Sequence, residues 1–167
     1  MSDDPYLAIP QLIYRYARAL DRLDAALLDA VFTADADIDM GAIYRGPPAG
    51  FVGVMTGFMG SMTATRHEIG NILIDIDDTG DGRRAGVEGY VTAWHRLDAD
   101  GKTQELIVRA RYLATAARTP AGWRIVAWSE VVDWGAVTPA SAAWVDGNAE
   151  LPKGSRDHVD VSYRFVR

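Results

Sequence analysis

The sequence predicts an α+β fold in which helices pack on one side of a mostly antiparallel sheet. Apolar residues recur at helical spacing over residues 9–24 and again over 51–62, with a short strand between them. From residue 65 onward, long β-type stretches follow one another, each bounded by turn residues. Helices that precede a run of antiparallel hairpins are typical of this fold class, and strands this long indicate a strongly curved sheet with bulges.

Two helices are expected at the N-terminus. Asp4 is a suitable N-cap with Pro5 at the first helical position, and the helix that they begin carries an apolar stripe over residues 9–20. Asp24 is expected to cap a second helix over residues 25–32.

Asp21 lies at the edge of the apolar stripe, with Tyr14 almost directly above it two turns earlier. Unlike Asp24, it has no capping role to explain it. A carboxylate on a core-facing edge needs a partner, because burying it unpaired is costly.

The next segment predicts a short strand over 38–40, a loop over 41–50 and a third helix over 51–62. The apolar stripe of this helix is either ordinary core or, because it is rich in Met and Phe, an adaptable wall for a hydrophobic ligand. The candidate ligand-binding residues from this region are Met40, Tyr44, Met55, Phe58 and Met62.

Residues 65–76 predict the strand of greatest interest. Strict alternation places His67, Ile69, Asn71 and Leu73 on one face, so that a histidine and an amide point the same way. A turn is expected over residues 77–82. Three further strands are expected over 87–97, 104–116 and 123–134, and residues 138–167 form a C-terminal extension.

Composition narrows the function classes. The 167 residues suffice for one domain with a sizeable core, and the net charge of −6 argues against nucleic acid or anionic membrane as a partner. The absence of cysteine excludes disulfides, thiolate nucleophiles and Cys-ligated zinc. With neither a signal peptide nor a transmembrane run in the sequence, we expect a cytoplasmic protein.

Most catalytic motifs are absent, and the three histidines have spacings that favour no metal site. The remaining candidate is a His–Asp pair, in which an aspartate orients an imidazole that acts as a base. Asp21 and His67 could form it, with a hydroxyl from Tyr14 or Tyr16 assisting an oxyanion. A buried ion pair that only ties helix to sheet is an equally weighted alternative.

An ordered set of short segments resembles SnoaL-like proteins of the nuclear transport factor 2-like superfamily. The resemblance covers residues 8–135, and it is strongest with the branch of scytalone dehydratase, bile-acid 7α-dehydratase and hexachlorocyclohexane dehydrochlorinase. It implies a cone-shaped α+β barrel wrapped by about three N-terminal helices around an apolar pocket. The matching segments are 14–24, 32–36, 65–67, 70–71, 90–93, 111–113, 122–125 and 132–134.

The resemblance also implies roles. In that branch an Asp of the first helix pairs with a His of the sheet, which gives Asp21 and His67, and a catalytic tyrosine matches Tyr16. Helical spacing favours Tyr14 instead, so the choice of tyrosine stays open. Glu88, Arg109 and Trp134 are further candidate pocket residues, although the two charged ones are more often surface or cross-strand partners.

The expected function is that of a cofactor-independent lyase, dehydratase-like, acting on a small aromatic or polycyclic substrate. Retro-aldol carbon–carbon cleavage and isomerisation use the same base. A non-catalytic binding protein, or an assembly protein similar to a dioxygenase small subunit, is the alternative from another class. The expected organisation is a barrel domain over 1–137, an extension over 138–167 that packs on the barrel or a neighbour, and a homo-oligomer, with a trimer favoured over a dimer.

Overall fold

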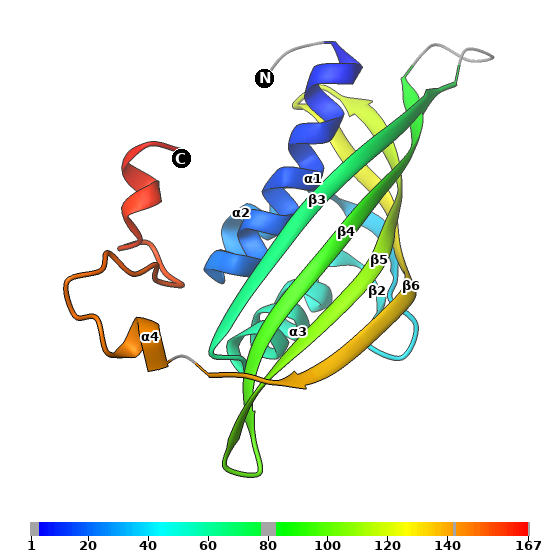
Figure 1. Cartoon of the computed structure of the whole chain (residues 1–167). Coiled ribbons are helices and arrows are strands. Elements are labelled where there is room, and N and C mark those ends of the chain that lie inside the picture. Colours follow the sequence, from blue (N-terminus) through cyan, green and yellow to red (C-terminus); the bar gives the residue numbers. More distant parts are fainter. Residues whose placement is uncertain (1–3, 78–82, 142, 167) are drawn as a thin grey trace.

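The computed structural model describes residues 4–77, 83–141 and 143–166. Three helices and a six-stranded mixed sheet form the body of the protein, and a C-terminal segment with two short helical turns follows (Figure 1). The elements are α1 (Pro5–Arg22), α2 (Ala25–Asp29), β1 (Phe32–Asp39), β2 (Arg45–Gly46), α3 (Pro48–Gly60), β3 (Ala64–Ile76), β4 (Arg84–Ala99), β5 (Lys102–Thr119), β6 (Gly122–Pro139), α4 (Ala143–Asp146) and η1 (Val161–Arg164).

The sheet confirms the predicted fold class. Its strand order is β2-β1-β6-β5-β4-β3, and every neighbouring pair is antiparallel except β1 with β6. Register shifts interrupt the ladders of β3 with β4 and of β5 with β6, and bulges of this kind bend strands. In Figure 1 the long strands accordingly curve around α1 and α3, which lie on the inner face of the sheet.

An aromatic cluster forms the centre of the core. The ring of Tyr16 on α1 lies 4.3 Å from that of Trp128 on β6 and 5.3 Å from that of Tyr112 on β5. Phe32 and Phe51 complete the cluster from β1 and α3. Aromatic contacts of this geometry stabilise a core beyond the area that they bury. The cluster therefore joins α1 firmly to the sheet and holds the helix that carries Asp21.

Both predicted helix caps are confirmed. The Asp4 carboxylate accepts a hydrogen bond from the Tyr6 N–H, and that of Asp24 accepts one from the Leu27 N–H, each at 2.9 Å. Between the two helices Leu23 adopts a left-handed conformation with φ of 53°, which ends α1 immediately after Asp21 and Arg22.

Several predicted boundaries are wrong. The second helix ends at Asp29 rather than at residue 32, and β1 begins at Phe32 rather than at residue 38. Phe32 pairs with Ile125 of β6, but a register shift between Phe32 and Asp37 breaks the alternation that would have revealed the strand. The predicted loop over 41–50 also contains β2 and the first turn of α3.

The predicted turn over residues 77–82 lies almost wholly outside the described residues, since only its first member, Asp77, is described. None of the helices within the described ranges combines the length and hydropathy that a membrane span requires.

Candidate active site

Asp21 and His67 form the predicted pair. The His67 Nδ1 lies 2.7 Å from the Asp21 Oδ1, and the His67 backbone N–H donates to the Oδ2 at 3.0 Å. The Thr65 hydroxyl donates to the Oδ1 at 2.9 Å. The carboxylate is thus held at both oxygens by the strand that carries the histidine.

These hydrogen bonds decide the charge of the carboxyl group. Burial by itself raises the pKa of Asp21, but the hydrogen bonds from His67 and Thr65, together with the attraction to His67, outweigh burial and bring the pKa below its ordinary value. An ionised Asp21 accepts the Nδ1 proton of His67, and this leaves the Nε2 of the imidazole as the free basic nitrogen.

His67 lies on the wall of a cavity of about 170 Å³ enclosed by α1, α3 and the inner face of the sheet. Tyr16, Met40, Met55 and Phe58 also line this cavity, as predicted from the sequence. An apolar cavity of this order holds about one aromatic ring.

The mouth of the cavity is also apolar. Among the lining residues, Ile43, Phe58 and Val132 are 48%, 44% and 61% exposed, so the cavity opens to solvent between α3, the loop before β2 and the middle of β6. A hydrophobic ligand would meet apolar side chains along its whole way in.

Three predicted ligand-binding residues lie close to the cavity without lining it. Tyr14 is 44% exposed and lies in a shallow surface groove behind the His67–Asp21 pair. Tyr44 packs on Phe51 and donates a hydrogen bond to the Pro47 carbonyl. Met62 is buried in the core. Of the two candidate tyrosines, Tyr16 is therefore the one beside the cavity.

Asn71 was expected on the face of His67, and this expectation is wrong. Ile69 pairs with Val91 and Ile72 pairs with Gly89, so two residues, Gly70 and Asn71, stand opposite one residue of β4. The bulge reverses the alternation and turns Asn71 outward. Beyond it, the half-buried Ile72 and Ile74 take the inner face, and Leu73 is 62% exposed.

Glu88, Arg109 and Trp134 also lie on the outer face and are absent from the cavity wall. Glu88 forms an ion pair with Arg111, at 3.7 Å. The Arg109 guanidinium lies over the Trp134 ring, 5.7 Å from its centre. The alternative interpretation of the charged residues, as cross-strand partners on the surface, is the correct one.

Two polar cavity residues were missed. His95 is 4% exposed, its ring lies 5.4 Å from that of His67, and both of its nitrogens lack a hydrogen-bond partner within the described part of the chain. Burial, followed by the neighbouring His67, lowers the pKa of His95 to about 4, so the ring is neutral at physiological pH. Alternation along residues 87–97 already separated His95 from Glu88 and Tyr90, which was the available signal.

Glu130 is the other missed residue. It lines the cavity from β6, and no hydrogen bond or ion pair of its carboxyl group is found in the described ranges. Burial raises its pKa, against a smaller opposite effect of His67. Its position two residues after Trp128, on the same face of the strand, could have revealed it.

Tyr16 contributes a hydroxyl that stays protonated. The residue is fully buried, and burial, with the charge of Glu130 as the second cause, raises its pKa well above the ordinary value. No group of three or more acidic or histidine side chains is arranged for a metal ion among the residues that the structure describes.

A SnoaL-like domain is matched over residues 4–129, and the chain belongs to this family. Its fold is the cone of NTF2-like proteins. No curated protein matches the sequence.

Solved structures share this fold at low sequence identity. A protein of Kribbella flavida, Kfla4162, is 25% identical with a TM-score of 0.69, and the match covers 78% of this chain and 92% of that one. A candidate scytalone dehydratase of Novosphingobium aromaticivorans is 20% identical, with a TM-score of 0.68 and coverage of 82% and 88%. Hexachlorocyclohexane dehydrochlorinase LinA-type3 of Novosphingobium barchaimii is 16% identical, with a TM-score of 0.68 and coverage of 82% and 90%.

Proposed function

We propose that the protein is a cofactor-independent lyase that eliminates water from a small hydrophobic substrate, with His67 as the base. The observation that carries the proposal is the hydrogen bond of 2.7 Å between His67 and Asp21 at the wall of an open apolar cavity. An ion pair that served only to join helix to sheet would have no need of a cavity beside the imidazole.

In the proposed reaction the Nε2 of His67 removes a proton from a substrate carbon. Asp21 fixes the tautomer and stabilises the imidazolium that forms. The electrons of the broken C–H bond form a carbon–carbon double bond, and the C–O bond of the departing hydroxyl group breaks. The products are an alkene and water once the departing oxygen has gained a proton.

Glu130 is the proposed source of that proton. Its burial favours the neutral carboxylic acid, which is the form that can protonate a leaving hydroxyl group. The Tyr16 hydroxyl supports the same oxygen by a hydrogen bond. After the step, His67 is cationic and Glu130 anionic, and their attraction stabilises this state until the proton returns. The neutral His95 offers a further polar contact for a substrate oxygen.

The size of the cavity narrows the substrate class. At about 170 Å³ it accommodates a single ring with small substituents more readily than a polycyclic skeleton. Larger substrates would require the α3 residues Met55 and Phe58 to move. The names of two structural neighbours, a candidate scytalone dehydratase and a dehydrochlorinase, support elimination as the reaction class.

The test is a screen of hydroxylated one- and two-ring compounds, with loss of water detected by mass spectrometry and the new double bond by ultraviolet absorbance. We expect a substrate that the wild-type protein converts and the His67→Ala variant does not. Tyr14→Phe, which alters a hydroxyl outside the cavity, is the matched control and should retain activity. Full turnover by His67→Ala would overturn the mechanism.

The same screen tests the alternatives. Carbon–carbon cleavage gives two smaller carbonyl products, whereas isomerisation leaves the mass unchanged. Saturable binding without any conversion would favour the non-catalytic binding protein instead.

A further inference from the structure

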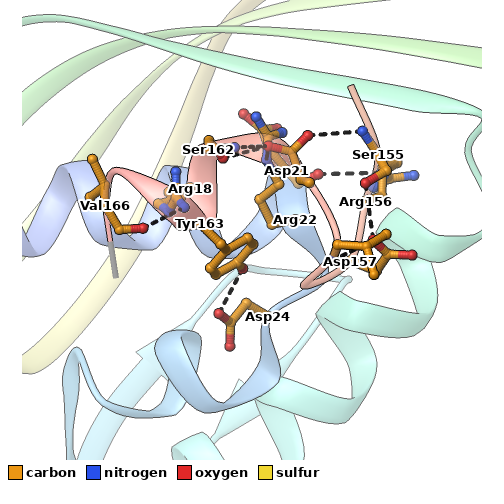
Figure 2. Close-up of polar contacts among 12 residues, drawn as sticks. Arg18, Asp21, Arg22, Asp24, Ser155, Arg156, Asp157, Ser162, Tyr163 and Val166 are labelled. Carbon is orange, nitrogen blue, oxygen red and sulfur yellow. Dashed lines mark hydrogen bonds and ion pairs between the residues drawn. The ribbon is translucent and has the colours of Figure 1, made fainter. Parts of the chain in front are cut away.

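The C-terminal segment places one arginine where three elements of the site meet. Figure 2 shows Arg156 next to the end of α1, with the segment lying across α1 and α2. The Arg156 Nη1 donates to the carbonyl oxygens of Met59, at 2.8 Å, and of Met62, at 2.7 Å. Its Nε donates to the Asp21 carbonyl at 3.4 Å, and its Nη2 donates to the Thr65 hydroxyl at 3.2 Å.

These acceptors explain why an arginine occupies this position. The last carbonyls of a helix lack partners within the helix and carry partial negative charge, so a cation is favourable there. Arg156 satisfies such carbonyls at the ends of α1 and α3 at the same time, and its planar fork of donors reaches them in different directions. A single side chain thus joins the helix of Asp21, the helix of Met55 and Phe58, and the start of the strand of His67.

The contact with Thr65 extends this network into the His67–Asp21 pair. Because the Thr65 oxygen accepts from Arg156, its own proton is directed to the Asp21 Oδ1, which is also the oxygen that bonds the His67 Nδ1. The hydrogen bonds run without a break from Arg156 through Thr65 and Asp21 to the imidazole.

We propose that Arg156 is a positioning residue for the His67–Asp21 pair, acting through the Thr65 hydroxyl. The C-terminal segment is then part of the working site, although it lies outside the cavity. The catalytic meaning of this inference rests on the proposed function, but the positioning itself can be measured without a substrate.

A simpler role for Arg156 would be to dock the C-terminal segment on the body. Other contacts of the C-terminal segment serve only to dock it on the body. The Tyr163 hydroxyl donates to the Asp24 carboxylate at 2.8 Å, and an Arg18 N–H donates to the Val166 carbonyl at 3.1 Å (Figure 2). Neither contact involves Thr65 or the Asp21 carboxylate. Tyr163→Phe is therefore a matched control that weakens docking and leaves the network intact.

The test is NMR spectroscopy of the protein labelled with ¹⁵N at histidine, in the absence of ligand. In the wild type we expect a His67 ring proton at Nδ1 that exchanges slowly with water, because it lies in the bond to Asp21. In Arg156→Gln its exchange should accelerate about tenfold or more, the change expected for a lost hydrogen bond of ordinary strength. Arg156→Lys should restore part of the protection, and Tyr163→Phe should match the wild type.

Combining two variants tests the route through Thr65. Thr65→Val should accelerate the exchange as Arg156→Gln does, and the double variant should be no worse than Thr65→Val alone. Independent, additive effects would overturn this route. A wild-type spectrum in Arg156→Gln, or an equal acceleration in Tyr163→Phe, would overturn the positioning role.

Thermal unfolding of each variant identifies any that does not fold. If Arg156→Gln fails to fold, Arg156→Lys and Thr65→Val carry the test. The two proposals can fail separately. If the wild-type protein has no lyase activity, but its His67 proton is protected and this protection depends on Arg156, the proposed lyase is refuted and the positioning role stands. If the wild-type protein is an active lyase and Arg156→Gln changes neither this activity nor the NMR spectrum, the positioning role is refuted and the proposed lyase stands.

Discussion

Both faces of the sheet carry titratable side chains, but those on the outer face are paired and partly exposed, whereas those on the inner face are shielded from solvent. On the outer face Arg111 contacts Asp133 at 2.9 Å and Glu88 at 3.7 Å, with every partner at least partly exposed. On the inner face no hydrogen bond or ion pair of the Glu130 carboxyl group is found among the described residues, and the shielded His67 ring pairs with Asp21.

The difference shows that burial, rather than residue type, distinguishes the charged groups of the two faces. On the exposed face, water screens each pair. On the inner face, desolvation favours neutral His95 and neutral Glu130. Burial therefore favours the uncharged forms of two titratable side chains in the same cavity.

The largest expected effect comes from exchanging two aspartates, Asp21 on α1 beside His67 and Asp133 on the outer face of the sheet. Asp21→Asn replaces the carboxylate with a neutral amide that accepts at one atom and donates at the other, so the His67 tautomer is no longer fixed, and we expect turnover to fall by about 10³- to 10⁴-fold. Asp133→Asn removes a partner of Arg111 on the outer face and should change turnover less than twofold. Steady-state kinetics of both variants on the substrate found by screening make the measurement. Similar losses in the two would refute the distinction between the faces.

The next largest effect is expected from exchanging a glutamate on each face of the sheet. Glu130→Gln keeps the shape of the neutral acid but cannot release a proton, and the expected loss in kcat is about 10²- to 10⁴-fold with little change in KM. Glu88→Gln should leave both constants unchanged. A Glu130→Gln enzyme with normal kcat would exclude this carboxyl group as the proton donor.

Glu130 also predicts a dependence of stability on pH. Since its pKa is raised in the folded state, the unfolded chain loses this proton first as the pH rises, and the folded state loses stability above about pH 4.3. The unfolding midpoint of Glu130→Gln in urea should therefore decline less than that of the wild type between pH 4 and 7. An identical decline in the two proteins would contradict a raised pKa of Glu130 in the folded state.

His95 predicts the opposite dependence. Its pKa is lowered to about 4, so protons bind preferentially to the unfolded chain as the pH falls below its usual value of about 6.5. Stability should fall from pH 6.5 toward pH 4, and His95→Gln should lose much of this dependence. His158→Gln, an exchange at an exposed histidine, is the matched control.

The smallest expected effect is on stability, from removing a charge on the outer face of the sheet. Arg111→Gln breaks exposed ion pairs, and the free energy of unfolding should change by about 1 kcal/mol or less. Urea titration at low and high salt measures the change. A loss of several kcal/mol would mean that these pairs contribute far more than screened surface charges do.

Much of the fold and the central pair of the site could be predicted from the sequence, because helical periodicity, caps and strand alternation are local signals. Asp21 was identifiable as a carboxylate at a core-facing edge without a capping role, and His67 as the histidine of a half-buried strand. The bulge at Gly70–Asn71 could not be predicted, since the register of β3 depends on its pairing with β4. Asn71 was misplaced for that reason.

The choice between Tyr14 and Tyr16 depended on the tertiary structure. Helical spacing from Asp21 favoured Tyr14, whereas the resemblance favoured Tyr16. Only the packing of α1 against the sheet shows that Tyr16 faces the cavity and Tyr14 the outside. Arg156 lay beyond any local pattern, because its partners are 91 to 135 residues away along the chain.

That separation bears on how the protein is made. Thr65 and Arg156 are 91 residues apart, a stretch that takes a ribosome roughly 5 to 20 seconds to synthesise. The helices and strands that carry Asp21 and His67 leave the ribosome well before the arginine that joins their ends. A nascent chain can therefore bury part of its apolar core before it completes the polar contacts beside the imidazole.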